Sequence, residues 1–241
     1  AGAGCTRAGA AVQALSPGQL QISGLRWAWP GQAPLFDGWQ ASLAPGLHWL
    51  QAEPGGGKTT LLRWLAGAAD SHGAAQHAGQ VLLDGMPLAR QGQGNSQHRI
   101  GCAWLNARDP AWDTLTPAAL RDHLRRQHPG LNDADWQRHI SGFSLAEHGF
   151  KTLHMLSTGM RHKAALAAVL ASGAPVLLLD EPCAGLDAPS VAWLVGALQA
   201  LVAQQDRWLL LAAGDWPPGL APGATLAVGQ AGPQPWPDAS V

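Results

Sequence analysis

The sequence predicts an α/β fold with a mostly parallel sheet, an N-terminal antiparallel β subdomain and an inserted helical subdomain. Three observations support this prediction. A glycine-rich turn at 52–57 stands between an apolar strand and a helix. Four aliphatic residues at 176–179 end in Asp180, which is typical of a buried parallel strand with an acid at its carboxyl end. Residues 20–43 form two short runs typical of antiparallel strands, separated by the turn Pro30-Gly31.

The 241 residues suit one α/β domain with subdomains. Residues 1–18 are rich in small side chains and are expected to form a flexible N-terminal segment. The main domain is expected at 19–230, with a helical subdomain at 107–156. A tail rich in proline and glycine follows at 231–241.

The expected elements of the first half follow from hydrophobic periodicity and turn residues. Strands are predicted at 20–29, with a break at Ser23-Gly24, and at 35–43. A helix is predicted at 59–69, a loop at 71–78 and a strand at 79–85 that ends in an Asp-Gly turn.

In the second half a strand is predicted at 99–105, and Thr116-Pro117 has the cap-then-proline order of a helix start. The helical sequence pattern from there to residue 156 is interrupted at Pro129-Gly130, Gly142 and Gly149. A helix at 164–171 and strands at 176–180, 208–213 and 224–228 complete the prediction. Four of the twelve tryptophans are expected in the core: Trp49, Trp64, Trp104 and Trp208.

The glycine-rich turn has the chemistry of a polyphosphate site. Glycines allow several backbone N–H groups to point at one anion, and the following helix adds its positive dipole end. Lys58 is expected to reach the β- and γ-phosphates of ATP, and the Thr59 hydroxyl to bind Mg²⁺. The residues predicted to contact ATP here are Ala52, Glu53, Pro54, Gly55, Gly56, Gly57, Lys58, Thr59 and Thr60.

The pattern G-x-x-x-x-G-K-[ST] is met except at its first position, where Ala52 replaces glycine. An ordinary glycine-rich turn is the alternative, and the strand before it and the helix after it argue against that alternative. The sequence therefore predicts a P-loop NTPase core.

A second site is predicted at the end of the strand 176–180. Asp180 is expected to hold Mg²⁺ through water, facing Thr59, and Glu181 to act as general base on an attacking water. Taken alone, these acids are equally consistent with a core strand capped by two carboxylates. The glycine-rich loop about 120 residues upstream favours the catalytic interpretation.

Composition excludes several classes of protein. The formal net charge of −1 provides no field that draws nucleic acid, so no nucleic-acid partner is expected. The three cysteines, Cys5, Cys102 and Cys183, lack the spacing of a zinc site or a disulfide framework, and reduced thiols in the cytosol are expected. No signal peptide or membrane span is predicted, so any work at a membrane is expected to pass through a partner.

A third motif, Leu156-Ser157-Thr158-Gly159-Met160, places a serine at a helix start close before the acidic strand. At this point the chain resembles the nucleotide-binding subunit of an ATP-binding cassette (ABC) transporter. Residues 52–59 resemble the Walker A loop, 156–160 the LSGGQ signature, 176–182 the Walker B strand and 184–187 the D-loop of this family. Trp29 matches the aromatic residue that stacks on adenine.

The resemblance implies a head-to-tail dimer that holds two ATP molecules between its subunits, as a homo- or heterodimer. The signature residues Ser157, Thr158, Gly159 and Met160, together with Asp187, would complete the partner's site. Closure on ATP and opening after hydrolysis would drive a membrane permease, coupled through the helical region. The expected location is cytoplasmic and peripheral, at the inner face of the cell membrane through that permease.

The sequence also departs from the family. No histidine follows His162, so the family's switch histidine is absent, and Gly214-Asp215 stands in the expected place. Asn106 occupies the position of a glutamine that contacts Mg²⁺ in the family, and it carries the same amide on a shorter arm. Thr158 and Met160 replace a glycine and a glutamine of the signature.

The prediction is an ATP-hydrolysing subunit of an ABC transporter, with Lys58 and Glu181 catalytic and Thr59, Asp180 and Asn106 at the metal. Turnover is expected to be slow or to need a partner. The first alternative is a regulatory subunit that binds ATP with little turnover, which the missing histidine favours and Glu181 opposes. A second alternative is a soluble cassette protein acting in DNA repair or translation, which the single cassette and the lack of basic surface disfavour.

Overall fold

The computed structural model describes residues 18–68, 76–88 and 101–229. Five predicted segments lie partly or wholly outside these residues: 1–17 of the N-terminal segment, 69 of the helix, 71–75 of the loop, 99–100 of the strand and all of the tail 231–241. The division of the chain into a domain with a helical subdomain stays a prediction.

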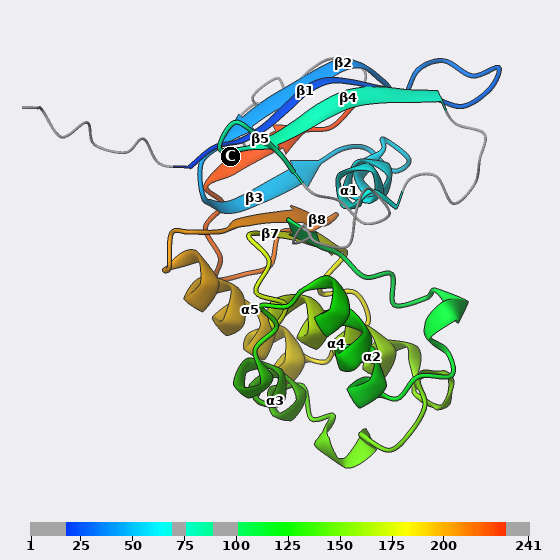
Figure 1. Cartoon of the computed structure of the whole chain (residues 1–241), viewed down its shortest axis with the longest axis vertical. Helices are drawn as coiled ribbons and strands as arrows, with labels where there is room; N and C mark the ends of the chain where they lie inside the picture. The colour runs from blue at the N-terminus through cyan, green and yellow to red at the C-terminus, as the bar shows by residue number, and fades with distance from the viewer. Residues whose placement is uncertain (1–17, 69–75, 89–100, 230–241) are drawn as a thin grey trace, which may run out of the picture.

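An antiparallel sheet with the strand order β2-β1-β4-β5 forms one side of the molecule (Figure 1). Its strands are β1 (Leu20–Ala28), β2 (Phe36–Leu43), β4 (Gln76–Leu83) and β5 (Met86–Pro87). The register of β1 shifts between Ile22 and Leu25, where Gly24 has a φ of 61°. This irregularity confirms the predicted break at Ser23-Gly24, since a positive φ suits glycine.

A parallel sheet with the order β6-β7-β8-β3-β9 crosses the middle of the molecule. Its strands are β3 (Gly46–Gln51), β6 (Cys102–Ala103), β7 (Val176–Asp180), β8 (Trp208–Ala212) and β9 (Ala224–Ala227). All its pairings are parallel, so the carboxyl ends of the strands meet at one edge, where ligands of α/β proteins bind.

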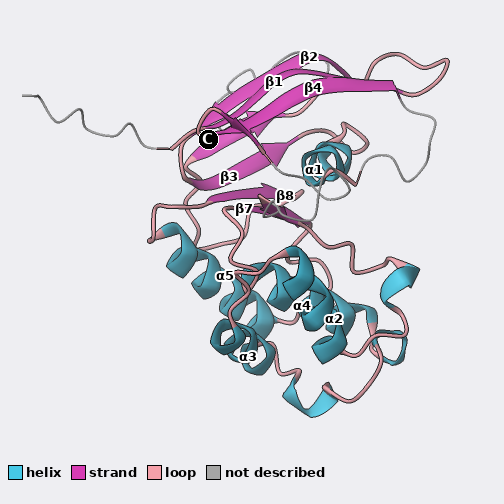
Figure 2. Cartoon of the chain, viewed as in Figure 1, coloured by secondary structure: helices cyan, strands magenta, loops and turns pink. Residues whose placement is uncertain are grey.

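Helices cover both faces of the parallel sheet (Figure 2). They are α1 (Lys58–Ala66), α2 (Pro117–Gln127), α3 (Asp133–Gly142), α4 (Thr158–Leu170) and α5 (Ala188–Val202), with short 3₁₀ turns at Pro110–Trp112, Ala146–His148 and Leu153–Met155. Helix α1 lies between the two sheets, and α2 to α5 lie on the other side of the parallel sheet (Figure 1). The α/β prediction is confirmed.

Alternate side chains of the buried strands point to the two faces of the parallel sheet. In β7, Val176 and Leu178 pack with α1 and the antiparallel sheet, whereas Leu177 and Leu179 pack with α4 and α5. Trp64 and Trp208 are buried as predicted. Trp104 is half-buried and packs against the same core, whereas Trp49 is half-buried and belongs to neither core cluster, so the core prediction was wrong for Trp49.

Several elements differ from the prediction, among them the start of α4, which is described with the site. Strand β4 begins at Gln76 rather than at residue 79, because its first residues pair with the end of β1. The described part of the strand predicted at 99–105 is reduced to the two residues of β6. Helix α5, for which the sequence analysis assigned no element, begins behind Asp187, whose side chain accepts the N–H of Ser190.

Helix α3 packs closely on α5 at one point. A Cβ on Gly142 would lie 2.0 Å from Cε2 of Trp193, so only glycine fits there. The ring of His139, one turn earlier, lies edge-on to Trp193 at a centroid distance of 6.1 Å. His139 is 2% exposed, and desolvation, helped by the charge of Arg138, lowers its pKa to about 4.

This histidine is expected to make stability fall in acid. Its pKa in the folded protein lies below the ordinary value of 6.5, so its contribution is complete above about pH 6.5 and is lost as the pH falls towards 4. The free energy of unfolding should decrease by at most about 1.4 kcal/mol per pH unit in that window from this group. Urea unfolding at several pH values should show a smaller slope in a His139→Gln variant; an unchanged slope would contradict the prediction.

Candidate nucleotide site

The glycine-rich loop between β3 and α1 is tightly folded. The N–H of Gly56 donates to the carbonyl oxygen of Glu53 at 2.8 Å, and Gly57 has a φ of 97°. A Cβ on Gly56 would lie 2.7 Å from Cβ of Ala52, and one on Gly57 would lie 2.8 Å from Cζ of Phe36. Ala52 itself has no positive φ, so alanine is compatible with its backbone at the first position of the motif.

The first turn of α1 has the features of an anion site. Its N-cap, Gly57, offers no side chain to cap the helix, and the first turn contains no acidic residue. The unpaired N–H groups and the positive end of the helix dipole therefore remain available for phosphate. Lys58 donates from Nζ to the carbonyl oxygen of Ala52 at 2.8 Å, which holds the ammonium group over the loop.

Thr59 and Asp180 meet at this loop. The Thr59 hydroxyl donates to Oδ1 of Asp180 at 3.2 Å, although the two residues are 121 positions apart in the chain. Asp180 ends β7, and Thr59 stands in the first turn of α1, so the parallel sheet brings the two predicted magnesium ligands together. A hydroxyl and a carboxylate are oxygen ligands of the kind that Mg²⁺ prefers, so the residues fit that ion.

The Asp180 carboxyl group is largely desolvated. Burial raises its pKa, and the hydrogen bond from Thr59 and the charges of Arg63 and Lys58 oppose this rise. A partly buried carboxylate beside a phosphate site is expected to be ionised most easily when a cation binds it. The pKa shift therefore agrees with a place for a divalent ion next to the loop.

Glu181 has an unusual backbone. Its φ is 45°, a left-handed conformation that costs a residue with a Cβ about 1–2 kcal/mol. Two hydrogen bonds hold the conformation: its N–H donates to the Ala212 carbonyl at 2.7 Å, and its carbonyl accepts the N–H of Ala184 at 3.0 Å. The side chain is exposed, and Oε2 lies 3.5 Å from the N–H nitrogen of Gly214. Such strain is found preferentially at functional sites.

The motif 156–160 begins a helix directly. Ser157 is the N-cap of α4, and its Oγ accepts the N–H of Met160 at 3.2 Å. The predicted place of Ser157 at a helix start is confirmed, and the helix runs from Thr158, six residues before the predicted range 164–171. Ser157 and Thr158 are exposed, whereas Gly159 and Met160 are half-buried.

Helix α4 holds the loop that follows β7. Nδ1 of His162 donates to the Ala184 carbonyl at 2.9 Å, and Nζ of Lys163 lies 3.1 Å from Oδ2 of Asp187. A Cβ on Gly159 would lie 2.7 Å from the Gly185 carbonyl oxygen, so the two backbones touch. These contacts define a clasp between α4 and the loop 184–187, and the sequence analysis missed it.

Two residues of the clasp have shifted pKa values. Hydrogen bonds from Ser190 and Lys163 lower the pKa of Asp187 to about 2. Burial lowers the pKa of His162, so the neutral ring that donates to Ala184 is favoured. Asp187 is thus bound within its own chain, to Lys163 and to the first turn of α5, and no described contact joins it to the glycine-rich loop.

Comparison with known proteins gives the family. Residues 47–184, more than half of the chain, match the family described as ABC transporter. The chain belongs to the ABC transporter family. Within this family the chain is a nucleotide-binding subunit, which confirms the resemblance found in the sequence.

Curated relatives agree with this assignment. A "Cytochrome c biogenesis ATP-binding export protein CcmA" of Pseudomonas fluorescens is 35% identical over 164 residues, which cover 66% of this chain and 72% of that protein. A protein of the same name from Pseudomonas syringae is 36% identical, and the match spans 59% of its length. A "Putative ABC transporter ATP-binding protein" of Streptomyces coelicolor is 30% identical, over 77% of this chain and 71% of that one.

Solved structures share the fold. The "Structure of a bacterial Atm1-family ABC exporter with ATP bound" superposes with a TM-score of 0.69 at 18% identity, covering 96% of this chain and 40% of that chain. The "Structure of ATP binding subunit of ABC transporter" gives a TM-score of 0.68 at 18% identity over 89% of this chain and 87% of that one. The fold is therefore that of ABC ATPase domains.

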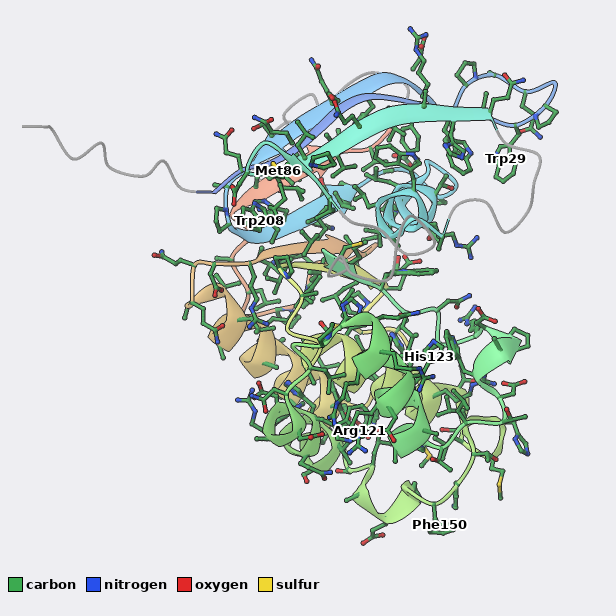
Figure 3. The ribbon with its side chains drawn as sticks, viewed as in Figure 1. Trp29, Met86, Arg121, His123, Phe150 and Trp208 are labelled. Carbon is green, nitrogen blue, oxygen red and sulfur yellow. The ribbon has the colours of Figure 1, made fainter. Side chains whose placement is uncertain are left out.

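Two further ABC positions are only partly in place. Asn106 turns its side-chain oxygen into its own loop, where it accepts the N–H of Arg108 at 3.1 Å. Its role as a metal ligand stays a prediction that requires this bond to open. Trp29 lies just beyond β1, at the turn end of the antiparallel sheet (Figure 3), and its ring is edge-on to Trp27 at 5.6 Å. Gly57 lies close to Phe36, the first residue of β2, because a Cβ added to it would be 2.8 Å from Cζ of Phe36. Strand β2 follows the turn after Trp29, so this strand packs against the phosphate loop.

Proposed function

We propose that this nucleotide-binding subunit binds ATP with Mg²⁺, hydrolyses it, and thereby powers a partner membrane permease. The hydrogen bond between Thr59 and Asp180 carries the proposal, because it joins the two predicted metal ligands beside an uncapped helix N-terminus. Lys58 lies in the same turn. This combination provides anion binding and cation binding side by side, as a nucleoside triphosphate with a divalent ion requires.

Each residue then has a defined task. The N–H groups of the loop 52–57 and the first turn of α1 hold the phosphates, and the Lys58 ammonium exchanges its bond to Ala52 for the β- and γ-phosphate oxygens. Thr59 and Asp180 hold Mg²⁺, which when bound neutralises developing charge on the phosphates. The Glu181 carboxylate accepts the proton of the attacking water.

A second ATP-binding subunit completes the site in this proposal. Ser157 and Thr158 are exposed, and the N-terminus of α4 carries N–H groups that suit the ATP held by a partner. Asp187, fixed by the clasp, would present its loop at the same interface. Trp29, half-buried at the edge of the antiparallel sheet, would stack on adenine.

The permease is expected to contact the helical part of the chain, by which we mean the predicted helical subdomain 107–156. Of three large apolar side chains that are exposed among the described residues, Phe150 and Met155 belong to this part, at 78% and 60% exposure. Figure 3 shows Phe150 at the end of the molecule farthest from the two sheets. No helix in the described ranges is long and apolar enough to cross a bilayer, and we place the subunit at the inner face of the membrane through its permease.

A regulatory subunit with little ATP turnover is the second candidate. It is favoured by the absence of any histidine after His162, where the family uses one beside the γ-phosphate. It is opposed by Glu181, which stands directly after β7 with its side chain exposed towards the loop that follows β8. We therefore keep hydrolysis as the main proposal.

The test compares ATP binding and turnover in the parent and in a Lys58→Ala variant. The variant should bind ATP about 10- to 100-fold more weakly, the equivalent of one or more hydrogen bonds to a charged group at about 1.5–3 kcal/mol. Parent turnover should require Mg²⁺ and disappear in EDTA.

The matched control is Lys151→Ala, since Lys151 lies in the helical part, 6.0 Å over the Phe150 ring. Equal ATP affinity in the parent and in Lys58→Ala would contradict the proposed ATP site. ATP binding without turnover in the parent would rule out hydrolysis by the isolated subunit, and would leave the regulatory candidate or a subunit that needs its partner.

A further inference from the structure

The segment 213–216, which follows β8 and stands where the family's histidine is expected, is fixed by tryptophan. Nε1 of Trp49 donates to the Ala213 carbonyl oxygen at 3.1 Å. Trp49 lies on β3, beside Leu211 of β8 in the parallel register, and only a few residues before the glycine-rich loop. One indole therefore connects the strand that carries the phosphate loop to the segment after β8.

A second tryptophan completes the arrangement. The ring of Trp216 lies against that of Trp49, with centroids 5.1 Å apart and planes at 37°. Its own Nε1 donates to the Leu220 carbonyl at 3.1 Å. Trp49 and Trp216 together form what we call the tryptophan latch. Because each ring is held by one hydrogen bond and by the other ring, the segment between Ala213 and Trp216 has little freedom.

The latch places one backbone donor at the predicted general base. Gly214 is exposed, and its N–H nitrogen lies 3.5 Å from Oε2 of Glu181, which is a long hydrogen bond. At this length the N–H group favours one rotation of the carboxylate, and with it one direction for the other carboxylate oxygen, without locking either. A backbone amide carries no ionisable proton at neutral pH, unlike the imidazole that the family has in this segment.

We infer that Trp49 and Trp216 are positioning residues for Glu181, which act by holding the Gly214 N–H against its carboxylate. The inference rests on the proposed ATP hydrolysis for its effect on rate, but the contact itself is independent of turnover. The hydrogen bonds and the ring contact of the two indoles are to Ala213, to Leu220 and to each other, so their proposed effect on Glu181 passes through the segment 213–216. They restrict the orientation of the Glu181 carboxylate. Without that restriction, a smaller fraction of the molecules has the carboxylate oriented to accept the proton of the attacking water.

The first measurement detects the contact without any turnover. In protein labelled with ¹⁵N-glycine, the Gly214 amide signal is identified by its absence in Gly214→Ala. A Glu181→Ala variant removes the acceptor, and Trp49→Phe removes only the latch hydrogen bond while it keeps a ring against Trp216. Both should move the Gly214 signal. Trp112→Phe, a half-buried indole whose Nε1 has no hydrogen-bond partner among the described residues, should leave it in place.

The second measurement is steady-state ATP turnover in Trp49→Phe and Trp112→Phe. Trp49→Phe should lower kcat about 2- to 10-fold, the effect of one neutral hydrogen bond, and leave KM for ATP unchanged. A Gly214 signal that ignores Glu181→Ala or Trp49→Phe overturns the inference, and so does an unchanged kcat in an active enzyme. A responsive signal in a protein without turnover supports the latch and rules out hydrolysis by the isolated subunit.

Discussion

A Glu181→Gln variant is expected to lose ATP turnover by about 10²- to 10⁴-fold, the usual contribution of a general base, and to keep its affinity for ATP. Glutamine has the same shape as glutamate, and its side-chain oxygen still accepts a hydrogen bond from Gly214. The backbone bonds to Ala212 and Ala184 remain. Only the ability to take a proton from water is removed, so the loss should appear in kcat.

The measurement is steady-state turnover, with ATP binding determined by titration in parallel. Glu147→Gln is a suitable control, because Glu147 is an exposed glutamate in the 3₁₀ turn Ala146–His148 of the helical part. Turnover that survives in Glu181→Gln would remove Glu181 from its proposed role. A large loss of ATP affinity would instead mean that the glutamate supports binding.

The motifs that local sequence defines were predicted correctly. The strand before the glycine loop, the helix after it and the strand that ends in Asp180 all lie where the pattern placed them, within a few residues. Each is specified by contiguous apolar residues and by glycines whose backbone conformation has few alternatives. The hydrogen bond between Thr59 and Asp180 then follows from parallel strands that share one edge.

Helix α5 was missed although its signal is present. Asp187 followed by Pro189 has the same cap-then-proline order as Thr116-Pro117, which did predict a helix. Ser157 was placed correctly at a helix start, but the helix itself was predicted only from residue 164, six residues after the observed start of α4. In the structure the close approach of Gly159 to Gly185 provides a reason for that glycine, which the local sequence does not contain.

The clasp and the tryptophan latch were not predictable, because both join segments distant in sequence. Lys163 and Asp187 are 24 positions apart, and Trp49 and Ala213 are 164 apart. Periodicity assigned Trp49 to the core, but its half-exposed indole has a hydrogen-bond donor that the neighbouring strand end can accept. Such pairings depend on strand order, which hydrophobic patterns do not determine.

A Gly57→Ala variant is expected to lose both stability and ATP affinity. The φ of 97° is unfavourable for alanine by about 1–2 kcal/mol, and the new Cβ would lie 2.8 Å from Phe36 and 3.0 Å from Leu35. Crowding of this kind adds about 1–3 kcal/mol, so the free energy of unfolding should fall by about 2–5 kcal/mol. Urea unfolding of the protein without nucleotide measures this loss.

The affinity loss has a separate cause. Moving the backbone at Gly57 misaligns the N–H groups at the start of α1, and each misaligned bond to phosphate costs about 1.5–3 kcal/mol, so affinity should fall about tenfold or more. Gly55→Ala is the matched comparison, since Gly55 also has a positive φ, of 80°, but open space around its Cβ position. It should lose only the conformational part, about 1–2 kcal/mol. Equal losses of stability and ATP affinity in the two variants would contradict this prediction. They would show that packing against Leu35 and Phe36 does not determine the conformation of the phosphate loop.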